Sequence, residues 1–125
     1  MVQEKQNTIL VIDDDPDIIM FLQFLLDDAG YTVVTAPTGA ILGQLQEETL
    51  PDLILLDLLL SGEDGCILTQ QLKGQAMTAH IPVILYSAHP GAEREAKVAG
   101  ADAFLAKPFG IDDILAIIAR LLDHS

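Results

Sequence analysis

The sequence contains few basic residues and a single cysteine, and both shortages narrow the range of functions. Of 125 residues, 19 are acidic and only 6 are lysine or arginine, which gives a net charge of −13. Surfaces that bind nucleic acid or anionic lipid need clustered basic side chains, so we expect no direct contact with nucleic acid or membrane. The lone Cys66 rules out an internal disulfide and any CxxC or CxxH zinc site, which suits a reducing cytoplasm.

Long apolar runs are also missing. No run approaches the roughly 18 residues of a membrane span, and residues 1–8 lack the basic-then-apolar order of a signal peptide. We therefore expect a cytoplasmic protein. Half of the residues (50%) are nonetheless hydrophobic, which is enough for one compact core, so we expect residues 1–125 to form one domain.

The negative charge is unevenly distributed along the chain. Residues 1–90 contain 13 acidic and 2 basic residues (net −11), whereas residues 91–125 contain 6 acidic and 4 basic residues (net −2). The nearly neutral C-terminal part would meet less electrostatic repulsion when it associates with a partner or a second copy.

Short apolar runs alternate with segments of helical period, which is the pattern of βα units around a parallel sheet buried on both faces. The runs predict strands at 9–12, 31–35, 53–56, 81–86 and 103–106. Helices are predicted at 16–29, from Thr38 to about 50, from Asp64 to Gly74, at 92–99 and at 111–122. This order predicts one doubly wound α/β domain.

Several predicted helices carry recognisable starts. Asp15 is the expected N-cap of the first helix, with Pro16 at its first position. Thr38 caps the second predicted helix, and Asp64 caps the third, in which Ile67 is expected to face the core.

Polar residues follow four of the five predicted strands. They are Asp13 and Asp14, Asp57, Ser87 and Lys107. The carboxyl ends of parallel strands share one edge of the sheet, where open α/β folds bind ligands, so we expect these side chains to lie together. Each residue alone has an ordinary explanation as a turn, capping or solvated residue, and only their combination favours a site.

The combination predicts a metal and phosphoryl site. Carboxylates about 5 Å apart repel by roughly 3 kcal/mol at an effective dielectric constant of 20, so a cation is expected among them. Oxygen ligands without cysteine or histidine favour Mg²⁺ or Mn²⁺. A divalent ion beside a carboxylate, with a lysine and a hydroxyl opposite, is typical of phosphoryl transfer. Asp57, which ends the predicted central strand, is the candidate nucleophile, and its product would be an acyl phosphate.

The order of these motifs resembles the receiver domain of two-component response regulators. The similarity covers nearly the whole chain and is carried by 9–15, 55–57, 64–65, 86–88, 100–101 and 107–109. The resemblance implies a flavodoxin-like (βα)5 fold, a five-stranded parallel sheet of order 2-1-3-4-5, and a single receiver domain over residues 1–125.

The resemblance also implies roles for the acidic residues. Asp57 matches the phospho-acceptor. Asp13 and Asp14 match the acidic pair that holds Mg²⁺ together with Asp57, and the backbone carbonyl of Leu59 is implied as a further ligand.

Three further positions match switch and binding residues of the family. Ser87 matches the hydroxyl that turns to bind the phosphoryl group, and Lys107 matches the lysine that pairs with it. Phe104 occupies the aromatic switch position. The peptide bond before Pro108 is expected to be cis, as is usual in the family.

Two departures from the family pattern matter, one at Ser61 and one at Leu59 and His89. Ser61 stands where a proline is usual in the loop after the acceptor. Leu59 and His89 occupy positions that flank the path of the hydrolysing water in the family. Because an apolar Leu59 cannot orient that water, slow self-dephosphorylation is predicted.

The resemblance implies partners as well as chemistry. A sensor histidine kinase, a phosphotransfer protein or a small phosphodonor would supply the phosphoryl group, and the chain would catalyse only its own phosphorylation and dephosphorylation. Output would pass to a downstream protein partner or effector domain. A homodimer could form through segments 92–99, 103–106 and 111–122.

Three alternatives belong to other classes. A haloacid-dehalogenase-like phosphatase needs Asp-x-Asp after its first strand, followed by Gly-Thr, and neither 13–16 nor 57–59 provides this. A flavodoxin-like FMN carrier needs a Ser/Thr/Gly-rich loop after the first strand, where three carboxylates here would repel the FMN phosphate. A receiver-like scaffold that works without phosphorylation stays the main alternative, although such proteins commonly lose a site residue that this chain keeps.

Overall fold

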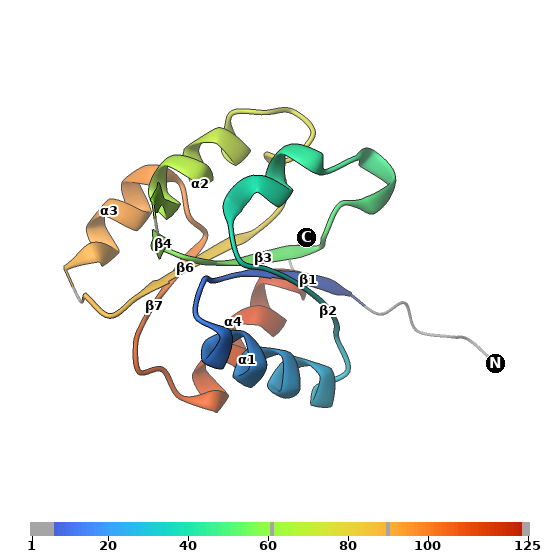
Figure 1. Ribbon diagram of the computed structural model, residues 1–125, viewed down its shortest axis with the longest axis vertical. Coiled ribbons are helices and arrows are strands. Elements are labelled where there is room, and N and C mark those ends of the chain that lie inside the picture. Colours follow the sequence, from blue (N-terminus) through green and yellow to red (C-terminus); the bar gives the residue numbers. More distant parts are fainter. Residues whose placement is uncertain (1–6, 61, 90, 124–125) are drawn as a thin grey trace.

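Five parallel strands form the centre of the molecule, and helices cover both faces of this sheet (Figure 1). The computed structural model describes residues 7–60, 62–89 and 91–123. The strands are β1 (Thr8–Ile12), β2 (Thr32–Ala36), β3 (Leu53–Asp57), β6 (Val83–Ser87) and β7 (Ala103–Ala106). Their order is β2-β1-β3-β6-β7, with every pairing parallel. Since β4 and β5 form a separate hairpin, this is the predicted 2-1-3-4-5 order, which is confirmed.

The α-helices lie on both sides of the sheet, as a doubly wound fold requires. They are α1 (Pro16–Asp28), α2 (Gly65–Lys73), α3 (Ala92–Ala99) and α4 (Ile111–Asp123). In Figure 1, α1 and α4 lie on one face and α2 and α3 on the other. None of the helices in the described part of the chain is long and apolar enough to cross a membrane.

The central strands β1, β3 and β6 are almost entirely apolar and buried because both of their faces meet a helical layer, whereas the edge strand β2 contains threonines and is partly exposed. In β1, Ile9 and Val11 pack with core residues of α1 and α4, whereas Leu10 and Ile12 pack with those of α2 and α3. Successive side chains of a strand point to opposite faces. The same alternation in β3, β6 and β7 decides which polar residues share a face at the strand ends.

The predicted helix starts are confirmed at α1 and α2. Asp15 Oδ1 accepts a hydrogen bond from the Asp17 N–H at 2.9 Å, and Pro16 is the first residue of α1. Asp64 Oδ1 accepts one from the Cys66 N–H at 2.8 Å at the start of α2. Both carboxylates satisfy an N–H that has no partner within its helix.

The segment after Thr38 does not form the predicted α-helix. Thr38 caps it, but the chain forms two 3-10 helices, η1 (Gly39–Gln44) and η2 (Glu47–Thr49). Two glycines within η1 lower its helix propensity. A Cβ at Gly39 would lie 2.7 Å from a methyl of Leu68, so glycine is what lets this segment approach α2 closely.

Two further predictions are wrong in detail. Ile67 does not face the core, since its side chain is 53% exposed, whereas Thr69 is buried and donates its hydroxyl to the Gly65 carbonyl at 2.8 Å. A hydroxyl satisfied within its own helix can occupy a buried face, which an apolar pattern alone does not reveal. The fourth strand begins at Val83, after Pro82, because proline has no N–H to pair with a neighbouring strand.

A short antiparallel hairpin, which the sequence does not predict, follows β3. It pairs β4 (Leu59–Leu60) with β5 (Glu63–Asp64). Glu63 Oε1 accepts a hydrogen bond from the Gly39 N–H at 2.8 Å, which ties the hairpin to η1. Ser61, where the sequence departs from the family pattern, lies outside the described residues. The residues that follow Asp57 are therefore fixed by hairpin pairing and by the contact of Glu63 with η1.

Candidate functional site

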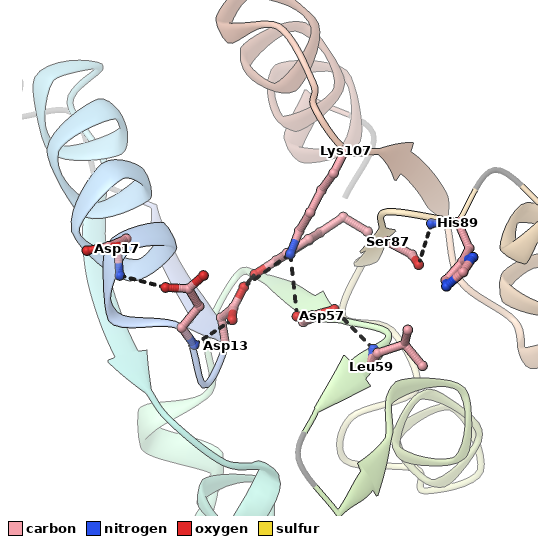
Figure 2. A network of polar contacts seen from close by, with 9 residues as sticks. Asp13, Asp17, Asp57, Leu59, Ser87, His89 and Lys107 are labelled. Carbon is pink, nitrogen blue, oxygen red and sulfur yellow. Dashed lines mark hydrogen bonds and ion pairs between the residues drawn. The ribbon is translucent and has the colours of Figure 1, made fainter.

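Strand alternation brings three charged residues to one face of the sheet. Asp13 follows β1, Asp57 ends β3 and Lys107 follows β7. Each continues the row of core residues that packs against α1 and α4, so their side chains point to the same side. Figure 2 shows the three side chains converging from their separate strands. The predicted grouping at one sheet edge is confirmed for these three residues and Asp14, whereas the Ser87 hydroxyl contacts the His89 N–H instead.

The Lys107 ammonium lies between two buried carboxylates. Its Nζ is 3.5 Å from Asp57 Oδ2 and 3.9 Å from Asp13 Oδ2 (Figure 2). Asp13 and Asp57 are only 1% and 7% exposed. One ammonium shared between two buried carboxylates cannot compensate both, so Asp13, Asp57 and Lys107 together keep a net negative charge.

The three carboxylates could hold a divalent metal ion. Asp13, Asp14 and Asp57 each offer an oxygen, and these atoms lie within 4.8 Å of one another. Asp14 is exposed, so the cluster is open to solvent on that side. A set of hard oxygen ligands with excess negative charge fits Mg²⁺ or Mn²⁺. The donor chemistry therefore fits the cation that the sequence predicts.

Asp57 is fixed by a backbone hydrogen bond, and its surroundings raise its pKa. Its Oδ1 accepts a hydrogen bond from the Leu59 N–H at 3.0 Å. Burial raises the pKa of Asp57, and the charge of Asp13 adds to the rise, while the Leu59 hydrogen bond and Lys107 oppose it. On balance the pKa of Asp57 stays above its ordinary value, so the positive charge nearby does not fully stabilise the ionised carboxylate.

Tyr86 belongs to this cluster, and the reasoning from strand ends missed it. Its hydroxyl donates a hydrogen bond to Asp13 Oδ2 at 2.7 Å, and Lys107 Nζ lies 5.0 Å from the centre of its ring. Burial raises the pKa of Tyr86 and the hydrogen bond to Asp13 raises it further, so the phenol keeps its proton. The alternation of side chains along 83–87 could have revealed it, because it places Tyr86 on the same sheet face as Ile84 and therefore on the face of Asp13 and Asp57.

Ser87 lies on the opposite face of β6. It is buried, and its Oγ accepts a hydrogen bond from the His89 N–H at 3.1 Å (Figure 2). The hydroxyl thus points toward the loop after β6. The Lys107 N–H donates to the Ser87 carbonyl at 2.8 Å, so the backbones of the two residues are joined.

Phe104 shares the sheet face of Ser87. In the register of β6 and β7 it pairs with Leu85, two residues before Ser87. Its ring is partly buried and lines a cavity of about 290 Å³ between α3 and α4, whose far side includes Ile117 and Arg120. Phe104 therefore faces a cavity that opens onto the surface of α3, β7 and α4.

Leu59 and His89 lie beside one cavity. Together with Ser87 they line a space of about 370 Å³, which Glu95 of α3 also borders. The Leu59 side chain is 56% exposed, and His89 is exposed as well. Both side chains therefore flank solvent-accessible space next to the hydroxyl.

The loop after β7 completes the site. The Lys107–Pro108 peptide bond is cis, which agrees with the expectation. Phe109 then packs edge-on against the ring of Tyr86, with ring centres 5.8 Å apart and planes at 71°.

Comparison with known proteins identifies relatives over nearly the whole chain. A family model described as the response regulator receiver domain matches residues 9–119. The DNA-binding dual master transcriptional regulator RpaA of Synechocystis sp. is 41% identical over 117 residues, which cover 91% of this chain and 48% of that protein. The chain therefore spans about half the length of this relative.

Solved structures share the fold. A structure described as a response regulator from Chloroflexus aurantiacus superposes with a TM-score of 0.89 at 30% identity, covering 95% of this chain and 99% of that one. The receiver domain of sensor histidine kinase PA1611 from Pseudomonas aeruginosa, whose active-site cleft holds a magnesium ion, has a TM-score of 0.84 at 26% identity, covering 95% and 99%.

Proposed function

The chain belongs to the response regulator receiver domain family, and on that premise we propose that Asp57 accepts a phosphoryl group in an Mg²⁺-dependent transfer. The observation that carries this proposal is the buried Asp57 carboxylate, which lies 3.5 Å from Lys107 and within one cluster with Asp13 and Asp14. A nucleophile, a fixed cation and a set of metal ligands are the parts that phosphoryl transfer needs.

The transfer follows from the placement of these groups. A carboxylate oxygen of Asp57 attacks the phosphorus in line, the bond from phosphorus to the donor nitrogen of a phosphohistidine breaks, and the leaving imidazole takes up a proton. Lys107 stabilises the charge on the phosphoryl oxygens. Asp13, Asp14, Asp57 and the Leu59 carbonyl would hold Mg²⁺, which neutralises further charge on the same oxygens.

Phosphorylation would act as a switch through Ser87 and Phe104. We propose that the Ser87 hydroxyl leaves the His89 N–H and binds the new phosphoryl oxygens, and that Phe104 moves into the vacated space. Because Phe104 lines the cavity between α3 and α4, its movement changes the α3–β7–α4 surface.

The lifetime of the phosphorylated state would depend on Leu59 and His89. The two residues line the cavity beside Ser87, and the apolar Leu59 offers no group that orients an attacking water. We propose slow self-dephosphorylation, and a shorter phosphoryl half-life in a Leu59→Asn variant is the observation that would support it.

The partners are proposed from the same family. A sensor histidine kinase, a phosphotransfer protein or a small phosphodonor supplies the phosphoryl group, and residues 1–125 act as one receiver domain. The output is contact of the α3–β7–α4 surface with a downstream protein, an effector domain or a second copy of the chain.

Labelling of Asp57 tests the proposed function. Acetyl phosphate and Mg²⁺ should add one phosphoryl group to the wild-type protein, as detected by intact mass, and none to an Asp57→Asn variant. Asp28→Asn, which removes an exposed carboxylate at the end of α1, is the matched control and should be labelled normally. A labelled Asp57→Asn variant contradicts the assignment, and an unlabelled wild-type protein favours the scaffold.

A further inference from the structure

Tyr86 is a fully buried polar side chain to which the proposed function gives no role. It lies in the middle of the charged cluster, where its hydroxyl contacts Asp13 at 2.7 Å and its ring lies under the Lys107 ammonium at 5.0 Å. A core position on this face of the sheet requires only an apolar side chain, as Ile84 shows two residues earlier.

We propose that Tyr86 is a positioning residue that orients Asp13 toward the metal ion and keeps Lys107 close to Asp57. This inference rests on the proposed function. Tyr86 touches neither the phosphoryl group nor the metal in this proposal and acts only through its two charged neighbours.

The hydroxyl completes the fixation of Asp13. The Asp13 side chain is fully shielded from solvent, so its oxygens depend on protein donors. Oδ1 accepts the Asp15 N–H at 2.8 Å and Oδ2 accepts the Tyr86 hydroxyl at 2.7 Å. Two donors on different oxygens fix the plane of the carboxylate, and each oxygen keeps a lone pair for a cation. Outer-shell bonds of this kind are typically worth about 10-fold to 100-fold in metal affinity.

The same hydroxyl limits the pull of Asp13 on Lys107. The ammonium is 3.9 Å from Asp13 Oδ2 and 3.5 Å from Asp57 Oδ2. If Oδ2 lost the Tyr86 donor, the metal-free protein would draw Lys107 toward Asp13 and away from Asp57, and a cation bound at Asp13 would cancel this pull. The ring below the ammonium adds a cation–π attraction that holds it in place.

The ring itself is anchored in the sheet. Tyr86 pairs with Asp57 in the register of β3 and β6, and its carbonyl accepts the Leu58 N–H at 2.9 Å. Phe109 packs edge-on against it from the loop after β7. A rigidly held donor can orient its acceptor without further loss of freedom when the metal binds.

Three variants separate the two contacts. Tyr86→Phe removes the hydroxyl and keeps the ring, Tyr86→Leu removes both, and Tyr31→Phe is the matched control for the loss of a hydroxyl from the other tyrosine of the chain. The Kd for Mg²⁺ is measured by calorimetry, and the rate of phosphorylation by acetyl phosphate is measured over a range of Mg²⁺ concentrations. Thermal unfolding without Mg²⁺ reports on the fold.

The expected results differ between the variants. Tyr86→Phe should raise the Kd for Mg²⁺ about tenfold, and saturating Mg²⁺ should restore its phosphorylation rate. Tyr86→Leu should raise the Kd as well and should keep a lowered rate at saturating Mg²⁺, because Lys107 loses the ring beneath it. Tyr31→Phe should match the wild type in both measurements.

Two outcomes contradict the inference in distinguishable ways. A Tyr86→Phe protein that binds Mg²⁺ within twofold of wild type, or whose rate defect Mg²⁺ does not restore, overturns the role of Tyr86 and leaves the proposed function standing. A wild-type protein that binds no Mg²⁺ overturns both.

Discussion

In the metal-free protein, Lys107 compensates the negative charge of Asp57 only in part. It is buried close to Asp13, and Lys107 is shared between the two carboxylates. Burial raises the pKa of Asp57, so the folded protein binds a proton there more tightly than the unfolded chain does. The site is therefore arranged for ligand binding at some cost in stability.

Removal of this charge should stabilise the metal-free protein. The free energy of unfolding of the wild type falls as pH rises from the unfolded pKa of about 3.9 through the raised folded pKa, because the folded state holds more protons in that window. The Asp57→Asn variant has no ionisable group at this position, so its free energy of unfolding does not fall with pH for this reason. We expect its thermal midpoint at pH 7 in EDTA to exceed that of wild type, with the difference vanishing near pH 3.

Thermal melts from pH 3 to pH 8 check this prediction. Addition of Mg²⁺ is the internal control, since it should stabilise the wild type more than the variant, which has one metal ligand fewer. A variant that is less stable than wild type in EDTA at pH 7 would show that the contact with Lys107 outweighs burial.

At the level of single residues, the sequence located those members of the site that follow a strand. Asp13, Asp57 and Lys107 are visible because each interrupts an apolar run at its end. Tyr86 is not, because an aromatic residue inside an apolar run is indistinguishable from core until the register places its hydroxyl beside a carboxylate. Its partner is 73 residues away in sequence, and only the fold brings them together.

The start of α2 packs directly against the turn that follows Asp57. The Gly65 N–H donates to the Leu58 carbonyl at 2.8 Å. A Cβ at Gly65 would lie 2.7 Å from both the Asp57 carbonyl oxygen and the Leu58 Cα. Because these are backbone atoms, a side chain at this position must displace the chain next to the acceptor.

We therefore predict that Gly65→Ala damages both the fold and the site. The free energy of unfolding should fall by about 1–3 kcal/mol, and Mg²⁺ affinity should fall with it because the Leu59 N–H no longer aligns with Asp57. Urea unfolding and calorimetry measure the two effects.

Gly43→Ala is the matched control for the glycine substitution. A Cβ at Gly43 meets no atom within 4 Å. Removal of a glycine from η1 should leave Mg²⁺ binding unchanged and should stabilise the protein by up to about 1 kcal/mol. Equal effects of the two substitutions would mean that contact with the acceptor turn is unimportant.

At the level of elements, hydrophobic periodicity predicted the five main strands and helices α1 to α4. It failed for the 3-10 helices and the short hairpin, whose packing follows no regular repeat. The central strands β1, β3 and β6 lie between two helical layers, so each of them requires an apolar run. The 3-10 segment after Thr38 is defined by glycines and by a contact with the hairpin, and strands of two residues such as β4 and β5 are too short to form a pattern.

At the scale of the whole molecule, charge separates two regions. Residues 91–125, which contain α3, β7 and α4, carry a net charge of −2, and residues 1–90 carry −11. Repulsion between two copies is therefore weakest when they meet through the α3–β7–α4 surface. The interior of α3 consists of alanines, and Val98 is exposed on the outside of this helix.

This difference predicts dimer formation on activation. Beryllofluoride with Mg²⁺ mimics the phosphorylated acceptor and should shift the wild-type protein to an earlier elution volume in size-exclusion chromatography. Asp57→Asn should elute as in the untreated sample. Arg120→Glu, which adds negative charge beside the Phe104 cavity, should weaken the shift. Identical elution of wild type with and without beryllofluoride at every concentration tested would exclude self-association and favour a different partner.

The chain contains no tryptophan and only two tyrosines. One of them, Tyr86, is sealed against solvent with its hydroxyl on Asp13 and its ring under Lys107. The near-ultraviolet absorption and emission of a phenol depend on the acceptor of its hydroxyl and on nearby charge. The protein therefore carries its own optical probe within the candidate site, and stopped-flow spectroscopy of the unlabelled chain can follow ligand binding there in real time, with a Tyr31→Phe background to isolate the signal.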